Sequence, residues 1–149
     1  MLKLFCCFSF SIGKKSANPI LWKETTPFVP PIESGIVIKV YDGDTITVAA
    51  QLPYPESPLY RFQVRLAGID SPEIKGKTEE EKTAAHKAQE ALETLVLHKT
   101  VLLKNRLQEK YGRILAEVYL DDLHVNQWLL DGGFAVPYDG KTKTAFESL

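Results

Sequence analysis

Alternating apolar and polar residues follow Gly35 and predict short β-strands. The pattern predicts a hairpin of Ile36–Val40 and Thr45–Ala49 around an Asp-Gly turn, which suits a tight two-residue loop. A loop with three prolines, Leu52–Pro58, precedes a third strand over Tyr60–Leu66. The first part of this region is therefore expected to be a hairpin followed, after a loop, by a third strand.

A helical period replaces the alternation in the second half of the chain. Residues Glu79–Leu97 carry apolar side chains three and four positions apart, with Thr78 as the expected N-cap and glutamates in the first turn. Further predicted elements are two strands, Thr100–Leu103 and Ile114–Leu120, a short helix, Val125–Leu130, and a last short strand, Phe134–Val136. Several short strands with one long and one short helix predict a mainly β, α+β fold, namely a small β-barrel with helices packed on it.

Composition supports a folded domain in the middle of the chain. The 149 residues are 44% hydrophobic and 25% charged, which is enough to bury a core. We expect a domain over residues 35–140, preceded by a leader and linker over residues 1–34 and followed by a short tail over residues 141–149. The formal net charge of −1 argues against a protein that coats nucleic acid through bulk positive charge, although Lys99–Arg113 is locally basic.

The first residues leave the compartment open. Residues 1–12 contain an apolar run, a basic pair follows, and Cys6 and Cys7 are adjacent and poorly placed for a relaxed disulfide with each other. Three interpretations stand side by side: a short signal sequence, a membrane-associated tail acylated at the two cysteines, and a leader that is disordered or forms a strand. The protein is accordingly secreted or membrane-associated under the first two, and otherwise cytoplasmic.

Three short segments carry candidate chemistry: Asp-Gly-Asp-Thr at 42–45, Arg-Leu-Ala-Gly-Ile-Asp-Ser-Pro-Glu at 65–73, and Lys-Tyr-Gly-Arg at 110–113. Each segment alone is a common turn or surface sequence. An EF-hand starting at Asp42 is excluded, because Thr47 occupies the position that needs glycine and Pro53 the position that needs glutamate.

Together the three segments supply the groups needed to attack a phosphodiester. Carboxylates are the ligands that a hard cation prefers, and a further carboxylate can act as a base. Guanidinium groups match phosphate oxygens in a two-pronged geometry and stay charged at all working pH values.

In this order, the segments resemble the staphylococcal nuclease (thermonuclease) family over roughly residues 35–140. The resemblance implies an OB-type five-stranded barrel with helices, one Ca²⁺ ion, and cleavage of DNA and RNA that leaves 3′-phosphate ends. It assigns the ion to the carboxylates of Asp44 and Asp70 and the backbone carbonyl of Ser71. It assigns catalysis to Arg65, Glu73 and Arg113. The remaining residues, expected to support the site or contact substrate, are Thr45, Lys110, Tyr111 and Tyr138.

The substrate is expected to be broad. The candidate contacts involve phosphates and base faces, and we see no reader of the 2′-hydroxyl, so both DNA and RNA are expected partners. A flexible single strand is expected to reach the pocket more easily than a duplex. We expect a monomer without an obligate protein partner.

Two other readings compete. A staphylococcal-nuclease-like domain that has lost catalysis would only bind nucleic acid or peptide, and a plain OB-fold scaffold would bind oligonucleotides without cutting them. The first is disfavoured because degenerate domains usually lack one or more of the acids or arginines that are all present here.

Overall fold

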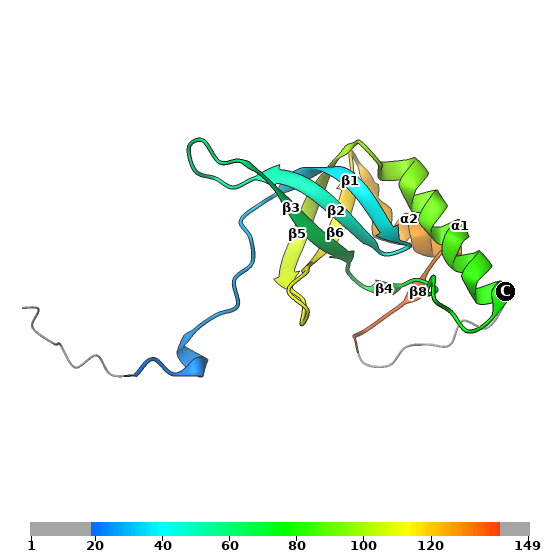
Figure 1. Ribbon diagram of the computed structural model, residues 1–149, viewed down its shortest axis with the longest axis horizontal. Coiled ribbons are helices and arrows are strands. Elements are labelled where there is room, and N and C mark those ends of the chain that lie inside the picture. Colours follow the sequence, from blue (N-terminus) through cyan, green and yellow to red (C-terminus); the bar gives the residue numbers. More distant parts are fainter. Residues whose placement is uncertain (1–18, 141–149) are drawn as a thin grey trace, which may run out of the picture.

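Five strands form a closed barrel, and two helices pack on it (Figure 1). The computed structural model describes residues 19–140. The barrel strands are β1 (Ser34–Asp42), β2 (Thr45–Gln51), β3 (Leu59–Leu66), β5 (Thr100–Gln108) and β6 (Ile114–Leu120). The other elements are a 3₁₀ turn (Trp22–Glu24), β4 (Ile69–Asp70), α1 (Glu79–Val96), β7 (Leu123–His124), α2 (Val125–Asp131) and β8 (Val136–Pro137).

One parallel pairing closes the barrel. The strands follow the order β3-β2-β1-β5-β6 through antiparallel ladders, and β3 then pairs with β6 in parallel, with Val64 opposite Ile114 and Leu66 opposite Ala116. This arrangement leaves no free edge along the paired segments of β3 and β6. It confirms the expected OB-type α+β barrel.

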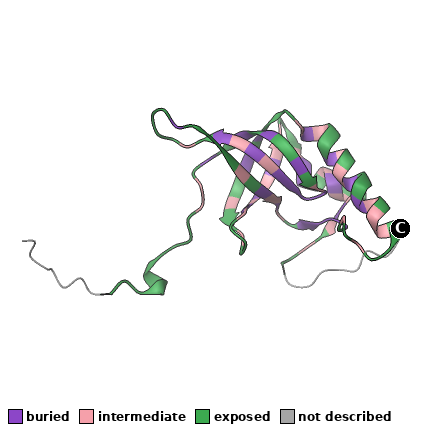
Figure 2. Cartoon of the chain, in the orientation of Figure 1, coloured by how far each residue is buried: buried purple, intermediate pink, exposed green. Residues whose placement is uncertain are grey.

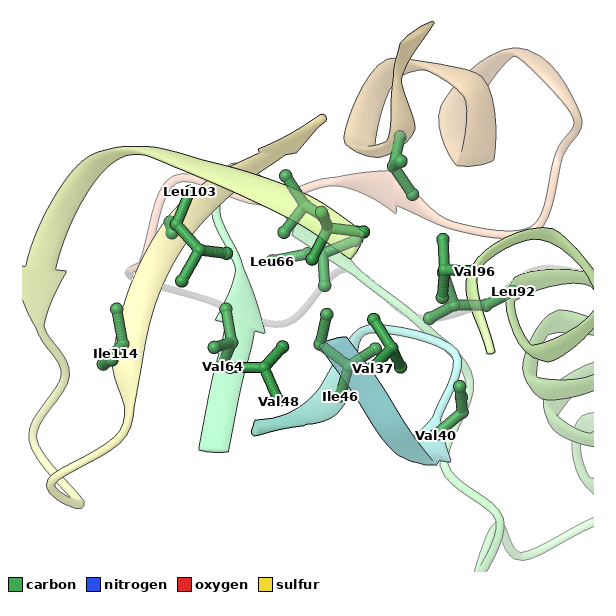
Figure 3. Close-up of a cluster of buried hydrophobic side chains, with 14 of the residues drawn as sticks. Val37, Val40, Ile46, Val48, Val64, Leu66, Leu92, Val96, Leu103 and Ile114 are labelled. Carbon is green, nitrogen blue, oxygen red and sulfur yellow. The ribbon is translucent and has the colours of Figure 1, made fainter. Parts of the chain in front are cut away.

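The inward side of each strand supplies the core. Figure 3 shows apolar side chains from the strands and from α1 meeting inside the barrel, and these are almost all β-branched or leucine. Val37, Val48, Val64 and Leu66 are fully buried, while the residues between them along the strands are more exposed (Figure 2). The alternation that predicted the strands is thus the alternation between the core and the outer face.

Helix α1 lies beside β1 with its small residues inward. Its buried stripe is Ala85, Ala88, Leu92 and Val96, and the Thr78 hydroxyl accepts a hydrogen bond from the backbone N–H of Glu81 at 3.1 Å. The cap satisfies one of the free N–H groups at the start of the helix, as the sequence predicted. The Gln89 amide donates to the backbone carbonyl of Tyr41 at 3.1 Å and joins the helix to the end of β1.

Some element boundaries differ from the sequence-based prediction. Strand β5 continues to Gln108 beyond the predicted end at Leu103, across a bulge where Asn105 has φ +49°. Its second half is polar, so alternation could not reveal it. The last strand is Val136–Pro137, paired with β4 in a second small sheet.

The predicted linker makes contacts with the barrel at its end. Ile32 is buried in the core, and the Leu103 N–H donates to the Glu33 carbonyl at 2.8 Å. Residues 1–12, with Cys6 and Cys7, lie outside the described residues, as does the whole predicted tail, residues 141–149. Among the described residues, no helix is both long and apolar enough to cross a membrane.

Candidate active site

The β1–β2 turn places the Asp44 carboxylate inside the protein. The Asp44 N–H donates to the Asp42 carboxylate at 3.1 Å, which fixes the turn. Asp44 is 2% exposed, and its two oxygens accept hydrogen bonds from the Thr45 hydroxyl at 2.9 Å and the Ser71 N–H at 3.0 Å. The predicted residues Asp44, Thr45 and Ser71 therefore lie in direct contact.

Gly43 permits this contact. A Cβ at position 43 would lie 2.7 Å from the Cβ of Ala88 on α1 and 2.8 Å from the Cβ of Ser71. Neither neighbour is a flexible side chain that can move aside. The turn can therefore approach the helix and the Ser71 segment only because residue 43 has no side chain.

Arg65 joins the two predicted cation ligands. It lies near the end of β3, between the core residues Val64 and Leu66, so its side chain is on the outer face of the barrel. One terminal nitrogen forms an ion pair with Asp44, and the other donates to Asp70 at 2.7 Å. Because Asp70 is only 5% exposed, the guanidinium balances two buried carboxylates at once.

The electrostatics of this cluster favour positive charge. Burial alone would lower the pKa of Arg65, but the charges and hydrogen bonds of Asp44 and Asp70 outweigh it and raise that pKa. Burial and repulsion from Asp44 raise the pKa of Asp42 to about 6. Asp44 and Asp70 thus share one guanidinium, and Asp44 has Asp42 as a second acidic neighbour, so an added cation would be favoured here.

The donor set fits a hard cation held by few protein ligands. Asp44 and Asp70 offer carboxylate oxygens that converge on the same guanidinium, and Ser71 touches Asp44 through its backbone N–H. Among residues 19–140, no three carboxylate, imidazole or thiol side chains are arranged to hold a metal ion by themselves. Backbone oxygen and water would therefore have to complete the coordination.

The loop between β5 and β6 holds a second cationic group. The Arg113 guanidinium pairs with Glu109 at 3.3 Å and lies over the Tyr111 ring, 5.8 Å from its centroid. The Lys110 ammonium lies 4.8 Å from the same centroid. Tyr111 is 74% exposed, so its ring remains accessible between two cations.

A pocket of about 360 Å³ connects the two regions. Its lining includes Arg65, Ile69, Glu109, Lys110 and Tyr138. The Arg65 guanidinium lies 5.9 Å from the centroid of the Tyr138 ring. Three predicted cationic and aromatic residues, Arg65, Lys110 and Tyr138, therefore line one cavity.

Arg113 and Glu73 stand further from the contacts that define the cluster. Arg113 precedes β6 by one residue, and Leu115 of that strand lies opposite Arg65 in the parallel pair. Glu73 is exposed, three residues beyond Asp70, and its carbonyl accepts from the Gly76 N–H at 2.8 Å in a turn. The predicted roles of both residues stay predictions.

Three residues that support the site were missed in the sequence. Asp42 fixes the turn, and Glu109 holds Arg113; both lay within or beside the quoted motifs. The Asn126 side chain, 2% exposed, accepts from the Val118 N–H at 2.9 Å and donates to the Ala67 carbonyl at 2.8 Å. It ties α2 to the β6 strand and to the end of β3, and a single Asn in a helix gives no sequence signal for that role.

Known proteins share sequence similarity with this chain. Residues 63–148 match the family model described as Staphylococcal nuclease homologue. An uncharacterized endonuclease of Escherichia coli is 34% identical over 106 residues, which is 70% of this chain and 61% of the relative. A protein of Haemophilus influenzae, also named uncharacterized endonuclease, is 31% identical over 102 residues, covering 68% and 51% of the two chains.

A fungal protein extends the similarity. The probable endonuclease LCL3 of Phaeosphaeria nodorum is 29% identical over 110 residues, which is 68% of this chain and 36% of that protein. The chain thus spans about 61% or less of the length of these curated relatives. The family model covers more than half of the chain and includes Arg65, Asp70, Glu73 and Arg113. The chain belongs to the staphylococcal nuclease homologue family.

Proposed function

We propose that this protein is a metal-dependent endonuclease that hydrolyses phosphodiester bonds in DNA and RNA with little sequence specificity. One observation carries the proposal: Arg65 contacts two buried acids on one side and faces a pocket lined by Lys110 and Tyr138 on the other. A cation site and a phosphate site would therefore adjoin each other. The relatives named endonucleases support the same activity.

We propose Ca²⁺ as the cation, held by the carboxylates of Asp44 and Asp70 and the backbone carbonyl of Ser71. Such an ion supplies Lewis-acid polarisation of a phosphate oxygen and lowers the pKa of bound water. The charge balance of the cluster supports this assignment, because two buried carboxylates there share one guanidinium. The Thr45 hydroxyl, bonded to Asp44, would keep that carboxylate in a fixed orientation.

The arginines would bind the phosphate whose bond is cleaved. Negative charge increases on the phosphate oxygens as the nucleophile attacks, and preplaced guanidinium donors stabilise that charge. Arg65 is held in position by its acid partners before substrate arrives, so little reorganisation is required. Arg113 would approach from the β5–β6 loop, oriented by Glu109.

Glu73 would either accept a proton from the attacking water or orient that water. It follows Asp70 by three residues along the chain and is exposed to solvent, so water can reach it. Lys110 would contact a neighbouring phosphate, while Tyr111 and Tyr138 would pack against nucleotide groups. The family resemblance further suggests products with 3′-phosphate ends.

The decisive experiment incubates the full chain with single-stranded DNA and, separately, RNA. Cleavage is expected with calcium and is expected to stop with chelator. The variant Asp44→Asn should lose cleavage, whereas the matched control Asp122→Asn, in the exposed turn before β7, should cleave normally. Binding without cleavage under every metal condition would refute the enzyme and favour a binding module.

Substitution of Glu73 tests its role separately. Glu73→Gln should slow cleavage by about 10²–10⁴-fold, because proton transfer in the transition state is lost. Calcium binding, measured by calorimetry, should be retained. Glu90→Gln on the exposed side of α1 is the matched control. If Glu73→Gln cleaved at the normal rate, the residue would have no part in proton transfer.

A further inference from the structure

The outer face of β1, β2 and β3 continues away from Arg65 and carries further positive charge. Strand alternation places Arg61, Gln63 and Arg65 of β3 on this face, because Val64 and Leu66 point into the core. The pairing of β2 with β3 is regular from Thr45–Arg65 to Gln51–Leu59, so no bulge breaks the row. Figure 1 shows these three strands side by side.

Small residues separate the charged ones. Thr47 pairs with Gln63 on one side and with Lys39 of β1 on the other, and Ala49 pairs with Arg61. We call Lys39, Thr47, Ala49, Arg61 and Gln63 the outer-face track. Thr47 and Ala49 in the centre of the track have short side chains, which would let the backbone of a bound strand approach.

The two cations of the track, Arg61 and Lys39, are exposed side chains. Within residues 19–140, neither Arg61 nor Lys39 has an ion pair, and both are exposed. The Lys39 ammonium lies 5.7 Å from the centroid of the Tyr41 ring, which is itself 57% exposed. The track is therefore a positive surface with one accessible aromatic ring beside it, directly continuous with the residues around Arg65.

The spacing suits an extended polynucleotide. Residues two apart on one face of an antiparallel strand are separated by about 7 Å, and Arg61 lies about 14 Å from Arg65 along β3. The distance between consecutive phosphates of an extended single strand is similar to the shorter of these two distances. The pocket with Tyr138 lies at the C-terminal end of β3, where Arg65 is located, and the track extends from Arg65 toward the other end of the strand. Arg65 therefore lies between the pocket and the track.

We propose that the outer-face track binds the phosphates of a single-stranded nucleic acid on the side of Arg65 opposite the pocket. The proposal deepens the proposed function and rests on it, because it defines the substrate as a strand of several nucleotides. Arg61 and Lys39 would be binding residues that increase the affinity for longer strands. A duplex would not fit this pattern equally well, since its phosphates follow a helical path rather than a straight strand.

Binding measurements test the proposal. The full chain is titrated, in chelator so that the strand is not cut, into fluorescent oligothymidylates, one a dinucleotide and one an octanucleotide. Arg61→Ala and Lys39→Ala should each weaken octanucleotide binding by about two- to fivefold, the effect of one exposed ion pair, and leave dinucleotide binding unchanged. Each should reduce the magnitude of the slope of log K against log salt by about 0.7.

Controls separate the track from general charge. Lys87→Ala removes one exposed lysine from α1 and should change neither affinity nor salt slope. Gln63→Lys adds a cation within the track and should strengthen octanucleotide binding while leaving the dinucleotide unaffected. Circular dichroism of each exposed-surface variant checks that the barrel is intact.

The outcomes are distinguishable from failure of the proposed function. If Arg61→Ala and Lys39→Ala behaved like Lys87→Ala, the track would be refuted even for a protein that cleaves DNA. If the wild-type chain failed to cleave with calcium yet showed the predicted length and salt effects, the nuclease proposal would fail and the track would stand. Equal binding of both lengths by the wild type would also refute the track.

Discussion

Two regions of the molecule supply the cationic groups of the site, and they are built differently. Arg65 belongs to a barrel strand, contacts two buried carboxylates, and has a side chain only 14% exposed. Arg113 belongs to a loop, has one acidic partner at 3.3 Å, and lies against an exposed tyrosine. The first arginine therefore supports the protein's structure as well as the proposed chemistry, whereas the second would, under the proposed function, serve chiefly to bind substrate.

The largest effect is expected for Arg65→Ala. Removal of the guanidinium leaves Asp44 and Asp70 buried without their partner, so the free energy of unfolding should fall by about 3 kcal/mol. Loss of the phosphate donor should lower kcat by about 10²–10³-fold. Chemical denaturation and cleavage kinetics measure the two effects. A variant with normal stability would show that the acids do not depend on Arg65.

Arg113→Ala should separate the two effects. Its loss should lower kcat by about 10²–10³-fold, because a phosphate donor is removed. Its partly exposed ion pair contributes less than about 1 kcal/mol, so the denaturation midpoint should change little. A stability loss as large as that of Arg65→Ala would contradict the contrast between the strand and the loop.

Gly43→Ala tests how rigidly the strand side is built. The added methyl would meet Ala88 and Ser71 below 3.0 Å, so the turn must shift, at a cost of about 1–3 kcal/mol. Displacement of Asp44 by about 1 Å should lower kcat by up to about 10²-fold. The double variant with Ala88→Gly removes one of the two clashes and should recover part of the lost activity. If the double variant recovered no activity, the contact with Ala88 would not be the cause of the loss in Gly43→Ala.

The same contrast explains what the sequence could predict. Strands and helix α1 followed from apolar periodicity, because Val37, Val64 and Leu92 pack according to local spacing. The parallel β3–β6 pairing joins residues 64 and 114, and the alternation of either strand carries no information about that partner. The polar extension of β5 to Gln108 was missed for the opposite reason, since it is a strand without a buried face.

The candidate site was predicted unevenly as well. The order of the three motifs indicated the family and drew attention to Asp44, Arg65 and Asp70. The double contact of Arg65 depends on how the β1–β2 turn meets the end of β3, which only the folded barrel determines. The support from Asn126 depends on a helix packed across the barrel, and no local sequence pattern identifies it.

The smallest expected effect concerns Glu109, which orients Arg113. Although burial would raise the pKa of Glu109, the Arg113 hydrogen bond, the Tyr111 N–H and the Lys110 charge outweigh it and lower that pKa below 4.5. Because the pKa of Glu109 is lower in the folded protein than in the unfolded chain, the ionised Glu109 carboxylate stabilises the folded protein. This contribution is therefore present above pH 4.5 and is lost as the pH falls through the depressed value.

Glu109→Gln should accordingly reduce the free energy of unfolding by less than about 1 kcal/mol at neutral pH. The difference from wild type should vanish in acid, where both side chains are neutral. Denaturation series at several pH values measure this, with Glu117→Gln as a control on the neighbouring strand. If the difference persisted unchanged in acid, its origin would be packing rather than charge, and Arg113 would owe its orientation to the Tyr111 ring instead.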